Sequence, residues 1–137
     1  MKVLLDTNIL LDFVLKRDPF EKDAVKIIEL CRDGIIRGYI AAHSYVNMFY
    51  ILRKHFTVEE RKSILYNLSK ITKIIQIDGK IIKAALNNDA FLDYEDCVQS
   101  ECADSVLADY IITRNVKDYS GSKIVALSPD KFLSFYS

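Results

Sequence analysis

Near the start of the chain stands Val3-Leu4-Leu5-Asp6-Thr7-Asn8, an apolar triplet followed at once by an acid, a hydroxyl and an amide. A short apolar run of this kind is typical of a buried strand. Apolar residues then recur at helical spacing over residues 9–14, until Asp18-Pro19 interrupts the pattern. The stretch therefore predicts a strand that ends at Asp6 and leads into a helix.

The rest of the chain alternates between strand-like and helix-like segments. Only four glycines and two prolines occur, and no repeat or low-complexity stretch indicates a linker, so we expect one domain over residues 1–137. The further elements that we predict are helices over residues 20–33, 44–53, from 57 onward, 78–87, 94–108 and from 128 onward, and strands over residues 38–42, 71–77, 110–113 and 124–127. The helices over 44–53 and from 57 should form a hairpin. Strands separated by helices predict an α/β fold, with a mainly parallel sheet of about four to five strands covered on both faces.

Composition and charge narrow the class of protein. Hydrophobic residues make up 50% of the chain, which is enough for a buried core. No apolar run reaches the roughly 18 residues of a membrane span, and an acid at position 6 interrupts any signal-type stretch, so we expect a soluble, cytoplasmic protein without a membrane partner. Its 19 basic and 19 acidic residues give a net charge of zero, so nucleic acid could be held only by local cations. The three cysteines form no metal-type pair, which favours buried, reduced thiols.

Three polar segments lie where predicted strands end or a helix begins. They are Asp6-Thr7-Asn8, Asp93-Tyr94-Glu95-Asp96 and Thr113-Arg114-Asn115-Val116-Lys117-Asp118. Taken singly, each has an ordinary explanation as a helix cap or as loop chemistry. A doubly wound sheet, however, gathers the carboxyl ends of its strands along one crevice. Together the segments predict a shared acidic site, whose repulsion a hard divalent cation would offset.

With these segments in this order, the chain resembles the PIN-domain family, and more closely the branch that includes VapC-type toxins of toxin–antitoxin pairs. The likeness covers nearly the whole chain. It rests on Val3-Leu4-Leu5-Asp6-Thr7-Asn8, Asp93-Tyr94-Glu95-Asp96, Tyr110-Ile111-Ile112-Thr113-Arg114-Asn115, Asp118-Tyr119 and Leu127-Ser128-Pro129. The resemblance implies a PIN-like fold of three layers, α/β/α, around a parallel sheet.

The same resemblance implies a metal site. Its catalytic ligands would be Asp6, Asp96 and Asp118, holding Mg²⁺ or Mn²⁺. The groups expected around them are Asn8, Asn47, Thr113 and Asn115. Two of these depart from the family's pattern, because many members carry a glutamate where this chain has Asn47 and an acid where it has Asn115. An amide brings no charge, so we expect weaker metal binding, with Asp118 as the substitute acid.

The activity that the resemblance implies is metal-dependent hydrolysis of RNA phosphodiester bonds. Bound ions would lower the pKa of a water and neutralise charge as the phosphate reacts. Candidate contacts to the RNA backbone are the cations of Arg53, Lys54, Arg114 and Lys117. Because toxin-like relatives pair with an antitoxin and often form homodimers, we expect an antitoxin protein as partner, and a homodimer is plausible.

Two alternatives stay open. A PIN fold that has lost its metal through Asn47 and Asn115 would be a catalytically inert module that binds nucleic acid or protein. A phosphotransferase of the aspartyl-phosphate type would use Asp6 as its nucleophile. Such enzymes need a second Asp two positions later, where this chain has Asn8. His43 and His55 are expected in solvent-facing or core positions.

Overall fold

The computed structural model of the protein describes residues 1–136. Its sheet consists of β1 (Lys2–Leu5), β2 (Arg37–Ala41), β3 (Lys73–Ile75), β4 (Tyr110–Ile112) and β5 (Ala126–Leu127). The strands lie in the order β3-β2-β1-β4-β5, and every neighbouring pair is parallel. The chain moves outward from β1 to β3 on one side and then crosses to β4 and β5 on the other. The switch point between β1 and β4 is where sheets of this kind form their binding crevice.

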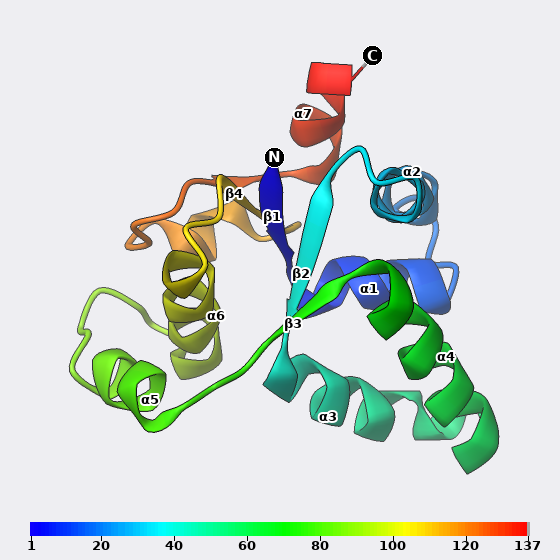
Figure 1. Ribbon diagram of the computed structural model, residues 1–137, viewed down its shortest axis with the longest axis horizontal. Helices are drawn as coiled ribbons and strands as arrows, with labels where there is room; N and C mark the ends of the chain where they lie inside the picture. The colour runs from blue at the N-terminus through cyan, green and yellow to red at the C-terminus, as the bar shows by residue number, and fades with distance from the viewer. Residues whose placement is uncertain (137) are drawn as a thin grey trace.

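Helices cover both faces of this sheet, as Figure 1 shows. They are α1 (Thr7–Val14), α2 (Glu21–Arg32), α3 (Ala42–Ile51), α4 (Val58–Ile71), α5 (Gly79–Leu86), α6 (Tyr94–Ser105) and α7 (Pro129–Leu133), with 3₁₀ segments η1 (Leu52–Lys54), η2 (Val116–Tyr119) and η3 (Ser134–Tyr136). The three-layer α/β/α arrangement predicted from the sequence is confirmed.

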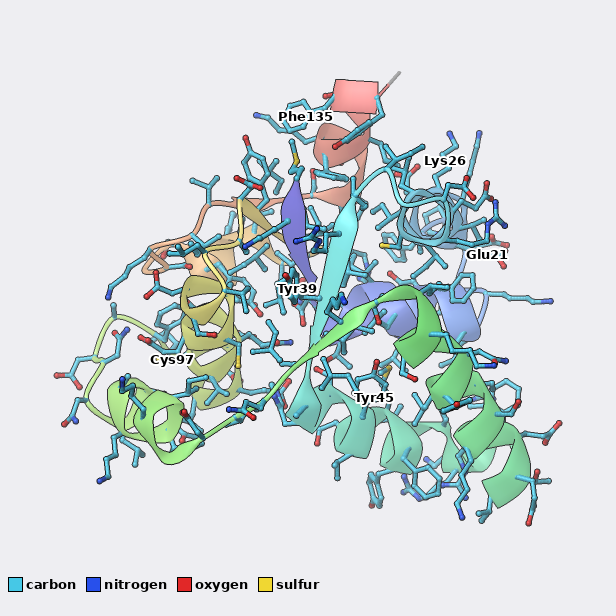
Figure 2. All side chains as sticks on the ribbon, viewed as in Figure 1. Glu21, Lys26, Tyr39, Tyr45, Cys97 and Phe135 are labelled. Atoms are coloured by element: carbon cyan, nitrogen blue, oxygen red, sulfur yellow. The ribbon has the colours of Figure 1, made fainter. Side chains whose placement is uncertain are left out.

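Alternation along the strands divides the interior into two cores. Val3 and Leu5 face a core with α1, α2, α3, α4 and α7, whereas Leu4 between them faces a core with α5 and α6. Figure 2 labels one member of each, with Tyr45 beside α3 and α4 and Cys97 beside α6. All three cysteines are buried and free, as expected. The sheet is therefore buried on both faces, which leaves its edges for polar chemistry.

Local signals in the sequence account for several helix boundaries. Thr57 and Glu60 form the reciprocal capping box that opens α4, and Asp78 caps α5. Gly34 takes a φ of +73° after α2, a conformation that favours glycine. The α3–α4 hairpin is confirmed, since Arg61 donates to the carbonyl oxygen of Phe49 at 2.7 Å and stacks over its ring.

The boundaries differ from expectation at several places. The strand expected over residues 124–127 is formed only by Ala126–Leu127. The β-branched run over residues 71–77 is a strand only at Lys73–Ile75, because Ile71 closes α4 and the Thr72 hydroxyl donates back to the carbonyl of Leu68 at 2.7 Å. The helix expected over residues 94–108 ends at Ser105, and Leu107 turns the chain at a positive φ of 53°. Within residues 1–136, no helix has both the length and the apolar character needed to cross a membrane.

Candidate functional site

Asp6, the acid of the first segment, lies at the switch point of the sheet. Leu5 pairs with Ile112 in the parallel register of β1 and β4, and the backbone N–H of Asp6 donates to the carbonyl oxygen of Ile112 at 3.0 Å. Asp6 and Thr113 are therefore the first residues beyond two adjacent strands. The first turn of α6, which carries Asp96, opens onto the same place, near the lower end of the sheet in Figure 1.

Asp6 is the buried centre of the site. Its side chain forms no standard capping bond to α1 and contacts only the N–H of Thr7 at the start of that helix, so helix capping does not account for its burial. The Thr113 hydroxyl donates to its Oδ2 at 2.7 Å, and the Gln99 amide donates to its Oδ1 at 3.3 Å. Burial raises the pKa of the Asp6 carboxyl, although hydrogen bonds from Thr113, from the backbone N–H of Thr7, and from Tyr119 and Gln99 oppose that rise.

Asp96 and Asp6 share one hydrogen-bond donor, the hydroxyl of Tyr119. The Tyr119 hydroxyl lies 3.3 Å from Oδ2 of Asp6 and 3.2 Å from Oδ1 of Asp96. A phenol carries one proton, so it can serve only one of the two carboxylates at a time. Burial, followed by the charges of Asp93 and Asp6, raises the pKa of Asp96 to about 6. Two acids thus sit close together without a cation among the described residues to balance them.

A ring of neutral groups fixes Thr113 behind Asp6. The Thr113 Oγ1 accepts from the Asn8 amide at 3.4 Å and from the backbone N–H of Asn115 at 3.0 Å. The side-chain Oδ1 of Asn8 in turn accepts from the backbone N–H of Arg114 at 3.5 Å. With both acceptor positions filled, the Thr113 hydroxyl is directed to donate to Asp6.

The remaining acids and the Asn47 amide lie farther from this centre. Asp93 caps α6 by accepting from the backbone N–H of Asp96 at 3.1 Å, the structural role that its position allowed. Asp118 is exposed in η2, although its charge contributes to the raised pKa of Asp96. Asn47 donates to Oε2 of Glu95 at 2.9 Å and not to the carboxylates of Asp6 or Asp96.

The four predicted RNA-contacting cations have different surroundings. Arg114 is held by Asp12, which accepts from its guanidinium at 2.6 and 3.2 Å, and it stacks over Phe20. Arg53 stacks over the ring of Tyr50, with its Cζ 3.7 Å from the ring centroid. The side chains of Lys54 and Lys117 are exposed. Arg114 is thus mainly a structural partner of a buried acid, whereas the other three face solvent.

Sequence reasoning missed three residues that shape the site. Gln99 is 0% exposed, Tyr119 is 3% exposed and Asp12 is 1% exposed. Asp12 interrupts the otherwise apolar run from Ile9 to Val14, and that interruption is the signal that could have identified it. Gln99 follows Asp96 by three positions on α6, so both side chains lie on the same face of that helix.

The donor set at the centre of the site fits a hard divalent ion. Within residues 1–136, no three His, Cys, Asp or Glu side chains gather closely enough to hold one ion. The carboxylates of Asp6 and Asp96 do converge, and Mg²⁺ commonly binds through one or two carboxylates with water completing its shell. The Oε1 of Gln99 is buried without a partner among the described residues, an acceptor that an ordered water could satisfy. The residues therefore fit an ion with two direct carboxylates.

Comparisons with known proteins identify the family to which this fold belongs. No curated protein matches the chain by sequence. The fold is similar to a solved structure titled VapBC2 from Rickettsia felis bound to promoter DNA, at 17% identity and a TM-score of 0.72, with 93% of this chain and 98% of that chain covered. It is also similar to VapBC-1 from nontypeable Haemophilus influenzae, at 18% identity and a TM-score of 0.72, with 95% of this chain and 99% of that chain covered. A toxin-antitoxin complex from Klebsiella pneumoniae is similar at 22% identity and a TM-score of 0.70, with 93% of this chain and 97% of that chain covered. The sequence model of the PIN domain matches residues 2–117. The chain, with its acids at the switch point of a parallel sheet, belongs to the PIN domain family.

Proposed function

We propose that this protein is a metal-dependent endoribonuclease, a hydrolase of RNA phosphodiester bonds, and the toxin component of a toxin–antitoxin pair. One observation carries the proposal. Two carboxylates, Asp6 and Asp96, converge on the Tyr119 hydroxyl at the carboxyl edge of a PIN fold. Repulsion between two acids in a partly buried site costs stability, so such a pair is maintained where a cation or a proton is used.

Asp6 and Asp96 would hold Mg²⁺ or Mn²⁺ directly, and Asp118 would join them through a water or a small movement of η2. The chemistry that a bound ion supplies is activation of water and neutralisation of charge on the phosphate. The chain's own residues prepare this site. Thr113 and Gln99 fix one oxygen each of Asp6, and Tyr119 ties that carboxylate to Asp96.

The substrate and partners follow from the family and from the surface. An RNA strand would approach along the exposed cations of Arg53, Lys54 and Lys117, with Arg114 contributing where its guanidinium is accessible. Solved relatives of this fold carry titles that name VapBC pairs or a toxin–antitoxin complex, which supports an antitoxin partner. We also propose a soluble cytoplasmic protein that can form a homodimer.

The test is cleavage of a mixed panel of structured and single-stranded RNA with Mn²⁺, with Mg²⁺ and with EDTA. Asp6→Asn and Asp96→Asn should each lower the rate by a hundredfold or more, as expected for loss of a direct metal ligand. Asp89→Asn is the matched control, because Asp89 is an exposed acid in the loop before α6. Equal cutting by wild type and all variants would reject the nuclease.

The inert binding module remains the second candidate, because no group of three acids forms among the described residues and Asn47 faces Glu95. Thermal unfolding with and without Mn²⁺ separates the two. A binding ion raises the melting temperature by mass action, and the two Asn variants should lose that rise. A wild-type protein that Mn²⁺ does not stabilise would favour the inert module.

A further inference from the structure

A pocket of about 530 Å³ lies beside the acidic site, and the metal chemistry does not use it. It lies between α3, α5 and α6, the three helices around the lower end of β2 in Figure 1. Its size falls in the range of small-ligand sites, roughly 300–1,000 Å³. A larger hollow of about 1040 Å³ lies at the opposite edge of the sheet, with Lys2, Arg37 and Ile36 at the amino ends of the strands, and has no contact with the acids.

The walls of the smaller pocket are mostly apolar. They are formed by Ala42, Val46, Ile77, Ile82 and Val98, with Tyr94 at its rim, 48% exposed. Among the described residues that line it there is neither Lys nor Arg. Burial lowers the pKa of His43, which keeps its ring neutral near pH 7. A phosphate or an acidic peptide would find no counter-charge here, whereas a neutral ring with apolar faces would fit.

The pocket also contains a carboxylate, that of Glu95, which can accept a hydrogen bond from a ligand. The Glu95 carboxylate accepts from Asn47 through Oε2, and its other oxygen has no partner among the described residues. Carboxylates accept hydrogen bonds from exocyclic amino groups, as in the pairing of Glu or Asp with the N4 amine of cytosine. Apolar walls with a single carboxylate acceptor therefore match a base that carries an amino group better than uracil, which presents a carbonyl oxygen at that edge.

The pocket lies next to the acidic centre, although Asp6 and Asp96 do not line it. Glu95 lines the pocket and is followed directly by Asp96 in the sequence. The charges of Glu95 and Asp6 both act to raise the pKa of His43, which also lines the pocket. A strand that passes its phosphate over Asp6 and Asp96 would thus bring a neighbouring base to the pocket mouth, where Tyr94 offers an aromatic surface for stacking.

We propose that this pocket binds the nucleobase next to the cleaved phosphate and favours adenine, cytosine or guanine over uracil. That the phosphate beside this base is cleaved rests on the proposed nuclease function, whereas binding of a nucleobase in the pocket does not. Val46, Val98 and Tyr94 hold the ring, and Glu95 selects its amino edge.

The first test needs neither metal nor cleavage. Backbone amide NMR spectra of the full chain are recorded in EDTA with adenosine, cytidine, uridine or ribose. Adenosine and cytidine should shift the amides of Val46 and Val98, and ribose should not. Val46→Trp should cover the pocket and abolish these shifts, and the protein should still fold because Val46 is 72% exposed. Val58→Trp on α4, also an exposed valine, is the matched control. Shifts that ribose reproduces, or that Val46→Trp leaves intact, would overturn the base site.

Cleavage of a short single-stranded RNA extends the test to the proposed activity. An abasic residue beside the cut should lower kcat/KM about tenfold, within the range expected for losing one stacked base. Glu95→Gln should reduce the preference for adenosine or cytidine over uridine several-fold. RNA that is cut with Mn²⁺ equally well with and without that base would reject the pocket and keep the nuclease. Nucleosides that bind in the pocket of a protein that cuts no RNA would keep the pocket and reject the nuclease.

Discussion

Asp96→Asn should stabilise the metal-free protein near pH 7.5 and leave its stability unchanged near pH 4. The reason is the carboxyl's raised pKa, which moves from its ordinary 3.8 to about 6 in the folded chain through burial and through the charges of Asp93 and Asp6. The folded state therefore binds a proton more tightly than the unfolded state. The contribution of Asp96 to the free energy of unfolding is therefore highest below the pKa of this carboxyl in the unfolded chain, and it is lost as the pH rises through about 6.

The magnitude follows from the size of this shift. About two pKa units correspond to about 3 kcal/mol, and screening by solvent around the partly exposed Asp96 reduces this by about half. Asp96 also carries a favourable negative charge in the first turn of α6, the loss of which costs about 0.5 kcal/mol. The substitution should thus gain about 1 kcal/mol near pH 7.5, or about 3 °C in melting temperature.

The assay is urea unfolding in EDTA at both pH values, followed by thermal unfolding with Mn²⁺ at about pH 7.5. Without metal the variant should be the more stable protein, whereas with Mn²⁺ only the wild type should gain stability. Asp89→Asn should behave as wild type throughout. A variant that is less stable than wild type in EDTA near pH 7.5 would show that Asp96 is a structural acid, and the argument from charge repulsion would fail.

Three further changes test other parts of the structure. Tyr119→Phe should weaken Mn²⁺ binding about tenfold by calorimetry, because it removes the donor shared by two proposed ligands; unchanged affinity would show that the hydroxyl has no positioning role. Asp12→Ala should lower the free energy of unfolding in urea by about 3 kcal/mol, since it leaves Arg114 without its buried partner; a loss under about 1 kcal/mol would mean that solvent replaces the pair. Thr57→Ala should cost about 1 kcal/mol in the same assay with RNA cleavage unchanged, and a fall in cleavage would contradict the assignment of Thr57 to helix capping alone.

The order of the elements could be predicted because the local signals agree with the fold. The Thr57 capping box, the Asp78 cap and the proline at the start of α7 all mark true helix starts. Boundaries were less predictable where two elements compete for the same residues. Ile71 has the β-branched side chain of a strand residue, yet packing of α4 against the core includes it in the helix. Propensity is a weaker determinant than tertiary burial at such positions.

The site was predictable only in part, because spacing along the chain does not give side-chain direction. Asp6 and Asp93 both stand before helices with the same capping appearance, but Asp93 caps α6 and Asp6 turns toward Thr113. The sequence could not separate them. The roles of Gln99 and Tyr119 could be recognised only from the structure, in which both side chains donate hydrogen bonds to Asp6 at the end of β1. The role of Asp118 stays a prediction that the metal-binding experiments address.

The hydrogen bond from Asn47 to Glu95 explains why an amide suits position 47, where many PIN-domain proteins carry a glutamate. Asn47 donates to Glu95 at 2.9 Å, and a glutamate at position 47 would set two acids against each other there. In this chain that bond joins the second turn of α3 to the first turn of α6, and both residues line the pocket beside the acids. On our proposals, an amide at position 47 weakens metal binding because it adds no charge beside the acids, and the same amide holds Glu95 next to the base beside the cut. Asn47 would thus influence both the ion and the base.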